Sequence, residues 1–378
     1  MQLNRTLKHA ALRTLAATIP ASRAAFQQPK SFLILQFASA LGTVLHATPL
    51  IRALRNASPQ GTILAATSGF GEDVLLNNPH IDELVPIENP LKDWRTARKD
   101  IAALVSRMDG DVGKNWATVT PLGNERTAIA LAAALGGARS LSGFTLAPQL
   151  YAGTLTFNPS RSQIANNLQI AELFEMGRPD HGEPEAFFAA DALNYIHALL
   201  GPERDAALPL VVFVTQTSPT QRKGWRADRF VSVAQWLVDR FSAQVAFVGT
   251  EVEKAAIEAI RGAVRGQTWN LAGQTNLPQL SALLSLCDVG LTLDTGTMHL
   301  GRAVGLPMVI VAPAWSPPIE WLPLNNPRYT ILKNATMPQA PADYVIDEVS
   351  TDEVTAALTD LLQRYPPGSR QRIAISSR

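Results

Sequence analysis

The chain alternates short apolar runs with amphipathic segments along most of its length. Apolar runs of four to six residues bounded by turn residues are typical of buried strands, and longer segments with periodic apolar positions are typical of helices. In the first half this pattern predicts strands at 32–37, 62–67, 83–87 and 116–121. It predicts helices at 43–55, 125–135, 162–176 and 190–200, with Pro49 kinking the first or limiting its start.

The alternation pauses at one polar stretch, residues 201–209 (GPERDAALP), which predicts a linker. Beyond it, strands are predicted at 210–215, 244–250, 268–273, 289–294 and 307–313. Helices are predicted between them at 229–241, 251–261 and 277–287.

Two blocks of alternating strands and helices predict an α/β protein with two doubly wound parallel sheets. The expected domains are 31–200 and 210–345, with a terminal helix and a loose tail in 346–378. Ligands bind such sheets at the carboxyl ends of the strands, so we expect the site in a cleft between the two domains.

Composition narrows the class of protein. Hydrophobic residues make up 46% of the 378 positions and charged residues 17%, which is typical of a globular chain. The formal net charge of +1 argues against a general nucleic-acid binder. The single cysteine, Cys287, excludes a disulfide framework and fits a reducing compartment. No apolar stretch approaches the roughly 20 residues of a membrane-spanning helix.

The first thirty residues form a basic extension that contains no aspartate or glutamate. Its basic residues are Arg5, Lys8, Arg13, Arg23 and Lys30. Apolar residues recur at helical spacing, at Leu3, Leu7, Ala11, Leu15 and Ile19. This pattern fits a helix lying on an anionic membrane surface, although a transit peptide or a frayed basic terminus would look similar.

The segment 293–311 (LDTGTMHLGRAVGLPMVIV) places small polar residues where a predicted strand passes into a helix. A helix N-terminus offers free N–H groups and partial positive charge to a phosphate. The residues expected to reach such a ligand are Thr295, Gly296, Thr297 and His299. Asp294 would repel phosphate, and its carboxylate is expected instead to accept hydrogen bonds from sugar hydroxyls. Ordinary helix capping would explain the same residues.

Other phosphate and metal motifs are absent or weak. The chain has no P-loop pattern, and GFGEDV (69–74) lacks the third glycine of a dinucleotide-binding loop. Residues 109–111 form a DxD pattern in what is predicted to be a polar loop, and the histidines lack zinc-ligand spacing. We therefore predict no metal site.

Four segments together resemble the family-9 glycosyltransferases, the heptosyltransferase family. They are FLILQFASALGTVLHATPLIRALR (32–55), NNPHIDELVPI (77–87), VTQTSPTQRKGWRADRFVSVAQWLVDR (214–240) and the stretch 270–311 ending in DTGTMHLGRAVGLPMVIV. The resemblance covers most of residues 31 to about 335, with the motifs in the family's order. It implies a GT-B fold, in which two Rossmann-like domains face a central cleft.

The resemblance also implies an activity. Members of this family transfer a sugar, often a heptose, from a nucleotide-diphosphate donor to an acceptor, with inversion and without an obligatory metal or cofactor. ADP-heptose is the favoured donor, and the acceptor is a glycan or lipid-linked glycan such as the lipopolysaccharide core. A cytoplasmic protein is expected, and the basic N-terminus would hold it on the inner face of the membrane.

The family's site residues carry over by position. Lys223 matches a lysine that neutralises the leaving diphosphate, and Asp294 matches an acid facing the sugar. Thr217 and Ser218 lie at the end of their predicted strand, near the donor, and could contact phosphate or base. Either Glu251 or Glu253 would bind the ribose. The residues expected at the pyrophosphate are Thr295, Gly296 and Thr297, with His299 nearby.

One expected residue is missing. Many members have glycine-aspartate where this chain has Gly42 and Thr43, and that aspartate is held to be the general base. A threonine hydroxyl has no accessible basic form at neutral pH. His46, on the same helical face as Thr43, could act instead, and so could Glu72 or Asp73. A basic acceptor or a water relay could also suffice.

Two other classes of function stay open. The chain could be a catalytically silent scaffold that binds a nucleotide sugar or a partner, or a sugar-nucleotide epimerase of the same architecture, which fits the motifs less well. Among the aromatic residues, Trp225 could flank the donor, whereas Trp315 and Trp321 are expected to be structural.

Overall fold

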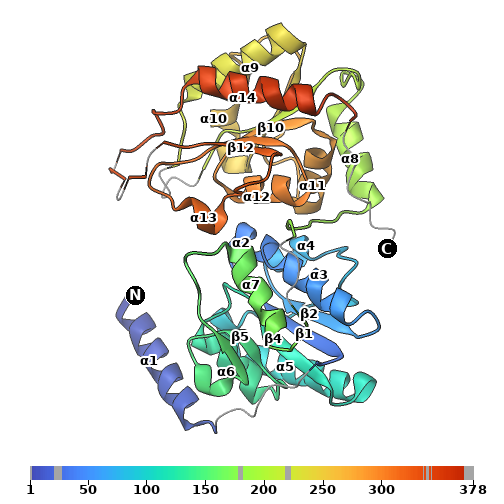
Figure 1. Ribbon diagram of the computed structural model, residues 1–378, viewed down its shortest axis with the longest axis vertical. Coiled ribbons are helices and arrows are strands. Elements are labelled where there is room, and N and C mark those ends of the chain that lie inside the picture. Colours follow the sequence, from blue (N-terminus) through green and yellow to red (C-terminus); the bar gives the residue numbers. More distant parts are fainter. Residues whose placement is uncertain are drawn as a thin grey trace. The chain divides into compact units, whose positions relative to one another are not determined.

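The computed structural model describes residues 2–20, 28–177, 182–217, 223–334, 336–337, 340–341 and 343–369, with side chains from residue 10 onward except that of Pro318. The chain divides into two compact units, Met1–Pro184 and Glu185–Arg378 (Figure 1). Each unit contains one parallel six-stranded sheet with helices on both faces. The predicted α/β class is therefore confirmed.

The sheet of the first unit has the strand order β3-β2-β1-β4-β5-β6. All of its neighbouring strands pair in parallel. The strands are β1 (Ser31–Gln36), β2 (Ile63–Thr67), β3 (Glu83–Pro86), β4 (Trp116–Thr120), β5 (Ser142–Phe144) and β6 (Gly153–Leu155).

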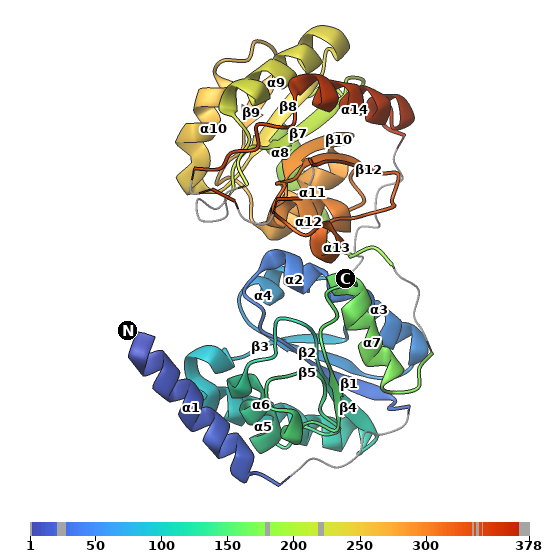
Figure 2. The same cartoon turned by 60° about the vertical axis from the view of Figure 1, so that its left-hand side comes forward.

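Helices cover both faces of this sheet (Figure 2). One face packs on α5 (Pro90–Val112) and α6 (Thr127–Leu135), and the other packs on α3 (Thr48–Ala57) and α7 (Gln163–Glu172). The alternation of side chains along β1 explains the two cores, because Leu33 and Leu35 join the α5–α6 side. The remaining elements are α1 (Gln2–Thr18), α2 (Leu41–Leu45), α4 (Phe70–Val74) and η1 (Pro148–Leu150).

The sheet of the second unit has the order β12-β11-β10-β7-β8-β9, again parallel throughout. Its strands are β7 (Leu210–Val214), β8 (Gln244–Val248), β9 (Thr268–Asn270), β10 (Val289–Leu293), β11 (Met308–Val311) and β12 (Tyr329–Leu332). Its helices are α8 (Ala190–Leu200), α9 (Ala227–Phe241), η2 (Glu251–Glu253), α10 (Lys254–Arg261), α11 (Leu277–Leu286), α12 (Gly296–Ala303), α13 (Pro318–Trp321) and α14 (Thr351–Arg364).

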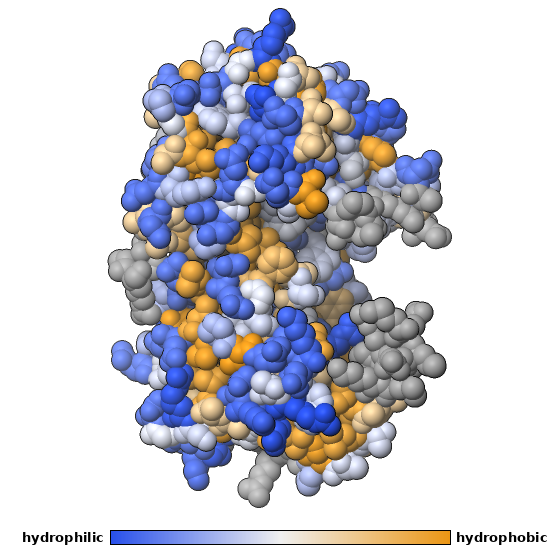
Figure 3. Space-filling view, turned by 180° about the vertical axis from the view of Figure 1, so that it is seen from behind, coloured by the Kyte–Doolittle hydropathy of each residue, from blue (hydrophilic) through white to orange (hydrophobic). Residues whose placement is uncertain are grey.

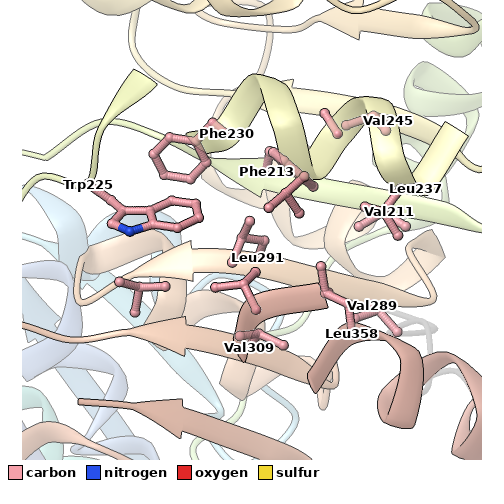
Figure 4. Packing of buried hydrophobic residues seen from close by; sticks show 14 of the residues in the cluster. Val211, Phe213, Trp225, Phe230, Leu237, Val245, Val289, Leu291, Val309 and Leu358 are labelled. Atoms are coloured by element: carbon pink, nitrogen blue, oxygen red, sulfur yellow. The ribbon is translucent and has the colours of Figure 1, made fainter. Parts of the chain in front are cut away.

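An aromatic cluster fixes the core between this sheet, α9 and α14 (Figure 4). The ring centroid of Phe213 lies 5.3 Å from that of Phe247 and 6.2 Å from that of Phe230. Trp225 packs edge-on against Phe230 at 4.9 Å, and its Nε1 donates a hydrogen bond to the carbonyl of Val349. Trp225 is therefore a core residue, and the expectation that it flanks a ligand is wrong.

Each sheet has a topological switch point, where strands on one side are added in one direction and strands on the other side in the opposite direction. In the first unit this switch lies between β1 and β4, and in the second between β7 and β10. The loops on either side of a switch diverge at the carboxyl ends of the strands and leave room for a ligand. Residues that follow these strands are the first place to look for a site.

The structure moves the predicted domain boundary toward the N-terminus. Helix α8 packs against α11 and belongs to the second unit, which begins at Glu185. Residues 201–209 are not a free linker, because Arg204 donates hydrogen bonds to the Leu208 carbonyl and to Gln244 at the start of β8. The polar composition of this stretch reflects a surface turn that is tied to the sheet.

Several elements differ from the predicted ones. The helix predicted at 43–55 is two helices, α2 and α3, and Pro49 lies at the second position of α3. The short strands β5, β6 and β12 were not predicted, and neither was α5. The DxD residues 109–111 lie in the last turns of α5 rather than in a loop.

The two ends of the chain are only partly described. Helix α14 confirms the predicted terminal helix, while residues 370–378 of the predicted loose tail lie outside the described residues. Helix α1 is present, and its Leu12 and Ala16 are buried in the first core. The side chains of Leu3 and Leu7 lie outside the described ones. No helix in the described part of the chain is long and apolar enough to cross a bilayer.

Candidate functional site

Helix α12 begins directly after β10, at the switch point of the second sheet. Thr295 occupies the N-cap position, yet its side chain makes no capping hydrogen bond. Its Oγ1 is buried and has no hydrogen-bond partner in the described part of the protein. A buried hydroxyl without a partner costs about 1–3 kcal/mol. Capping therefore does not explain this residue, and its free hydroxyl points to a ligand that the helix end would bind.

A buried ion pair lies beside this helix end. Lys223 Nζ is 2.7 Å from Asp294 Oδ2, and the two side chains are 13% and 2% exposed. The ammonium also lies 5.6 Å from the centroid of the Trp315 ring. Trp225, which is packed in the core, follows Lys223 by two residues and so fixes the backbone close to this lysine. The structure thus brings together the lysine and the acid that the sequence placed 71 positions apart.

The charges around α12 are mostly positive. Asp294, Arg302 and Lys223 all act electrostatically on His299, and Asp294 also acts on Lys333. Burial lowers the pKa of His299 to about 4, so the imidazole is neutral at physiological pH. Two carboxylates, Asp294 and Glu348, thus act on this group of three cations, which leaves a positive excess that complements a diphosphate better than a neutral ligand.

The loop after β11 supplies site residues that the sequence analysis missed. Lys333 Nζ donates hydrogen bonds to the carbonyls of Pro313 and Ala314, at 2.6 and 2.7 Å, and its burial lowers its pKa. The Tyr344 hydroxyl accepts a hydrogen bond from the Ala314 amide. These contacts hold the segment that carries Trp315. In the sequence, Lys333 directly follows β12, at the edge of the sheet where ligands bind. The sequence analysis did not identify it because β12 was not predicted.

The two tryptophans of this region lie beside predicted site residues rather than apart from them. Trp315 contacts Lys223, as described above, and the Trp321 ring centroid lies 5.7 Å from that of His299. Both side chains are half-buried. The expected structural role is therefore combined with a position at the edge of the site.

The turn after β8 separates the two candidate ribose ligands. The Glu253 carboxylate accepts hydrogen bonds from the Thr250 amide and hydroxyl at 2.7 and 2.9 Å, which makes it part of a helix cap. Glu251 is 71% exposed at its side chain and pairs only loosely with Lys254, at 3.4 Å. Glu251 is therefore the carboxylate that is available to a ligand.

The strand β7 ends near the same edge of the sheet. Thr217 follows it by three residues and is half-buried, and β7 neighbours β10. Ser218 lies outside the described residues. The segments that follow β7, β8 and β10 therefore contribute all the described donor-site candidates, namely Thr217, Lys223, Glu251, Glu253, Asp294, Thr295, Gly296, Thr297 and His299.

The candidate catalytic residues of the first unit are poorly exposed. Thr43 on α2 is 8% exposed, and His46, which ends that helix, is 1% exposed. The His46 carbonyl accepts a hydrogen bond from Asn167 at 3.0 Å, which fixes the backbone there. A ring buried to this extent does not present either nitrogen to a dissolved acceptor, which argues against His46 as the base.

The DxD pattern has a structural explanation. The Asp109 carboxylate binds the Arg139 guanidinium and accepts a hydrogen bond from Trp116 Nε1, and these contacts lower its pKa to about 2. Across the described ranges of the chain, no group of three or more His, Cys, Asp or Glu side chains is placed to hold a metal ion.

Comparison with solved structures places this architecture among known folds. A family 9 glycosyltransferase from Veillonella parvula superposes with a TM-score of 0.77 at 19% identity, over 90% of this chain and 99% of that one. The Escherichia coli ADP-heptose lipopolysaccharide heptosyltransferase II gives a TM-score of 0.72 at 18% identity, over 88% and 98% of the two chains. At these identities the likeness shows the fold, which is GT-B.

Sequence comparison adds the family. The lipooligosaccharide heptosyltransferase 2 of Haemophilus influenzae is 32% identical over 131 residues, which span 32% of this chain and 36% of that protein. Matches to such curated relatives cover about a third of their length. The family model "Glycosyltransferase family 9 (heptosyltransferase)" matches residues 156–344, half of the chain and all of the site around α12. The chain belongs to glycosyltransferase family 9, the heptosyltransferase family.

Proposed function

We propose that the protein is an inverting glycosyltransferase that moves heptose from ADP-heptose to a glycan or lipid-linked acceptor such as the lipopolysaccharide core. The observation that carries the proposal is the buried, unpartnered hydroxyl of Thr295 at the N-terminus of α12, beside the pair formed by Lys223 and Asp294. A diphosphate would satisfy this hydroxyl and the free N–H groups of the first turn.

The residues around α12 suit the departure of a nucleoside diphosphate. In an inverting transfer the acceptor oxygen attacks the anomeric carbon while the bond from that carbon to the diphosphate oxygen breaks. The leaving diphosphate takes the electron pair and gains negative charge, which Lys223 and the end of α12 stabilise. We propose that these fixed positive groups perform this role without a metal ion. Asp294 holds Lys223 in place and accepts hydrogen bonds from the sugar.

The donor preference rests on the same residues and on the relatives. The Escherichia coli neighbour is named as an ADP-heptose enzyme. In this chain Glu251 is available to accept hydrogen bonds from the ribose hydroxyls, and His299, being neutral, contributes no charge. No described residue selects adenine directly, so the choice of ADP is drawn from the family.

Calorimetric titration with ADP, UDP, GDP and ADP-heptose tests the donor site. We expect ADP and ADP-heptose to bind without added metal, and Lys223→Ala to weaken both by about tenfold or more, because the paired cation is removed. Arg240→Ala is the matched control, since it removes an exposed cation of the same unit, on α9. Selective binding of UDP or GDP would show that the donor carries that nucleotide and not ADP.

Turnover separates the proposed enzyme from a silent scaffold. The observation favouring the scaffold is that Thr43 and His46, the residues at the expected base position, are buried and offer no accessible carboxylate. Incubation with ADP-heptose and a heptose-deficient lipopolysaccharide core should yield ADP and a heptosylated glycan. Tight binding of ADP-heptose with no ADP released from any acceptor would establish the scaffold instead.

We also propose that α1 lies on an anionic membrane at the cytoplasmic face. The face of α1 that packs into the core carries Leu12 and Ala16, so Ala11 and Leu15 of the predicted apolar stripe are exposed. Further large apolar residues of the first unit are exposed, at Phe70, Leu76, Leu91, Leu135 and Leu146. On the face shown in Figure 3, apolar patches are interspersed with hydrophilic surface.

Vesicle co-sedimentation tests this placement. On vesicles of phosphatidylethanolamine and phosphatidylglycerol, Leu15→Glu should reduce bound protein several-fold, because it places a charge where the helix would enter the interface. Thr14→Glu adds the same charge one residue away and serves as the control. Equal binding by the two variants and the wild type would contradict a role for α1 at the membrane.

A further inference from the structure

A large hollow lies at the carboxyl edge of the first sheet. Its volume is about 1170 Å³, and the segments that line it follow three neighbouring strands: 37–39 after β1, 68–73 after β2 and 87–92 after β3. Residues of α5 complete the wall. The hollow is built entirely from the first unit, on the side of the sheet where ligands of doubly wound folds bind.

Helix α4 brings two carboxylates, those of Glu72 and Asp73, to this hollow beside the helix that lacks the expected base. Helices α2 and α4 pack against each other, and Figures 1 and 2 both show them side by side. Thr43 lies on α2, and Asp73 lies on α4 and lines the hollow. Phe70, on the same helix, adds an exposed aromatic ring to the lining.

Five titratable side chains line the hollow: Glu72, Asp73, Glu88, Lys92 and Asp100. Three of the carboxylates accept hydrogen bonds from backbone amides. Glu72 bonds to the amide of Gly69 at 2.9 Å, Glu88 to that of Asn89 at 2.9 Å, and Asp100 to that of Glu88 at 3.2 Å.

The other two titratable side chains that line the hollow are Lys92 and Asp73. The Lys92 side chain offers hydrogen-bond donors and no acceptor. Asp73 is exposed, and within the described residues its carboxylate accepts no hydrogen bond. Among the described carboxylates that line the hollow, Asp73 is therefore the one that no backbone amide holds in place, and both of its oxygens are available to a bound molecule.

We propose that Asp73 is the general base of the transfer, in place of the aspartate that is absent at Thr43. This inference rests on the proposed function, because it concerns the acceptor side of the same reaction. As the acceptor oxygen bonds to the anomeric carbon, its proton passes to an Asp73 carboxylate oxygen, and the diphosphate leaves with the electron pair of the broken bond. The acceptor is accordingly a glycan with a free hydroxyl at this hollow.

The surroundings of Asp73 make it a stronger base than a free aspartate. Partial burial and the neighbouring charge of Glu72 raise its pKa above the ordinary value of 3.8. The other charged groups that face the hollow are Glu88, Lys92 and Asp100, and α2 contributes no charged side chain. A base with a raised pKa takes a larger share of the proton in the transition state.

The test uses the full chain with ADP-heptose and a heptose-deficient lipopolysaccharide core. Asp73→Asn should lower kcat by about 10²- to 10³-fold, which is the usual contribution of a general base, while calorimetric affinity for ADP stays unchanged. Glu83→Gln, which alters an exposed carboxylate of the same unit paired with Arg107, should stay within about twofold of the wild type. Thermal unfolding checks that both variants are folded.

Two further readouts separate a base from a structural role. Thr43→Asp combined with Asp73→Asn should regain at least tenfold of the lost kcat, because α2 then supplies a carboxylate beside α4. The acidic limb of the kcat/KM profile, which should lie above the pKa of an ordinary aspartate, should disappear in Asp73→Asn.

The possible failures are distinguishable. If Asp73→Asn keeps kcat within threefold while Lys223→Ala loses it, the base assignment is overturned and the proposed function stands. Loss of kcat in Asp73→Asn with an unchanged acidic limb and no rescue by Thr43→Asp also overturns the assignment. A wild-type chain that releases no ADP from ADP-heptose removes the proposed function, and the base assignment falls with it.

Discussion

The two sheets of this protein share one strand order, yet their carboxyl edges carry opposite arrangements of charge. Counted from the first strand of each unit, both run 3-2-1-4-5-6. At the edge of the second sheet a buried carboxylate, Asp294, is paired with Lys223, and Arg302 and Lys333 add positive charge that Glu348 only partly offsets. At the edge of the first sheet, four carboxylates and one lysine line an open hollow.

This difference shows that the side chains at the carboxyl edge of each sheet, and not the topology, determine which chemistry is possible there. The shared topology provides a switch point in each unit and says nothing about which ligand binds there. A cationic edge with a paired acid stabilises a leaving diphosphate, whereas an edge with an unpaired carboxylate such as Asp73 accepts a proton. Under the proposed function, the second unit would bind the leaving diphosphate and the first would supply the base, each on the same type of sheet.

The largest effect is expected on kcat, when a positive charge is removed from the carboxyl edge of the second sheet. Lys223→Ala should lower kcat by about 10²- to 10³-fold, because the leaving diphosphate would lose a largely buried positive group that stabilises its charge. Steady-state release of ADP from ADP-heptose measures the effect, with Arg240→Ala as the control. An unchanged kcat in Lys223→Ala would mean that this edge only binds the donor and that its charge does not act on the leaving group.

The next effect concerns the neutral histidine within that edge. Folding lowers the pKa of His299 from 6.5 to about 4, so below pH 6.5 the unfolded chain binds a proton that the folded chain does not. The stabilising contribution is complete above pH 6.5 and is lost as the pH falls toward 4. The slope approaches about 1.4 kcal/mol of unfolding free energy per pH unit.

Urea unfolding at pH 7, 6 and 5 measures this slope in the wild type and in His299→Gln. The variant should show a shallower pH dependence, because it removes the group that titrates differently in the two states. The difference between the two slopes isolates His299 from the other histidines of the chain. Parallel slopes would show that the imidazole titrates alike in both states, and the edge would then gain a cation at mildly acidic pH.

A smaller effect tests the unpartnered hydroxyl at the end of α12. Thr295→Val should weaken ADP binding by about tenfold, while the free energy of unfolding stays the same or rises, because an unsatisfied buried hydroxyl is removed. Thr292→Val is the matched control. Its hydroxyl is satisfied by the Leu293 carbonyl at 2.8 Å, so that variant should lose stability by about 1 kcal/mol and keep its ADP affinity. The opposite pattern would identify Thr295 as structural.

Much of the fold could be predicted from the apolar runs. Strands such as β1, β7 and β10 are buried on both faces and produce continuous apolar stretches that are easy to recognise. The edge strands β6 and β12 are short and half-exposed, so their sequences carry little pattern. Helix α5 escaped prediction because its first turns contain Pro90 and a non-helical Asp93.

Part of the candidate site could be predicted from a local motif, whereas the strands were predicted from apolar runs. Asp294 and the threonines of α12 lie within one strand-to-helix motif, where local spacing reports the geometry of a helix end. The partners that hold the site come from elsewhere in the chain. Lys333, for example, acts through the carbonyls of loop residues that lie 19 and 20 positions away along the chain. Long-range contacts of this kind leave no mark in local sequence.

The smallest expected effect sharpens the comparison at the turn after β8. Glu251→Gln should weaken ADP binding by a few-fold, because an exposed carboxylate that accepts ribose hydroxyls is neutralised, and unfolding should be unaffected, since its pair with Lys254 is loose and exposed. Glu253→Gln should do the reverse and cost about 0.5–1 kcal/mol of unfolding free energy through the weakened cap. Calorimetry with 2′,3′-dideoxy-ADP completes the test. The Glu251→Gln loss should vanish with this ligand, because the hydroxyls it would contact are gone, and a loss that persists would place Glu251 near the phosphates instead.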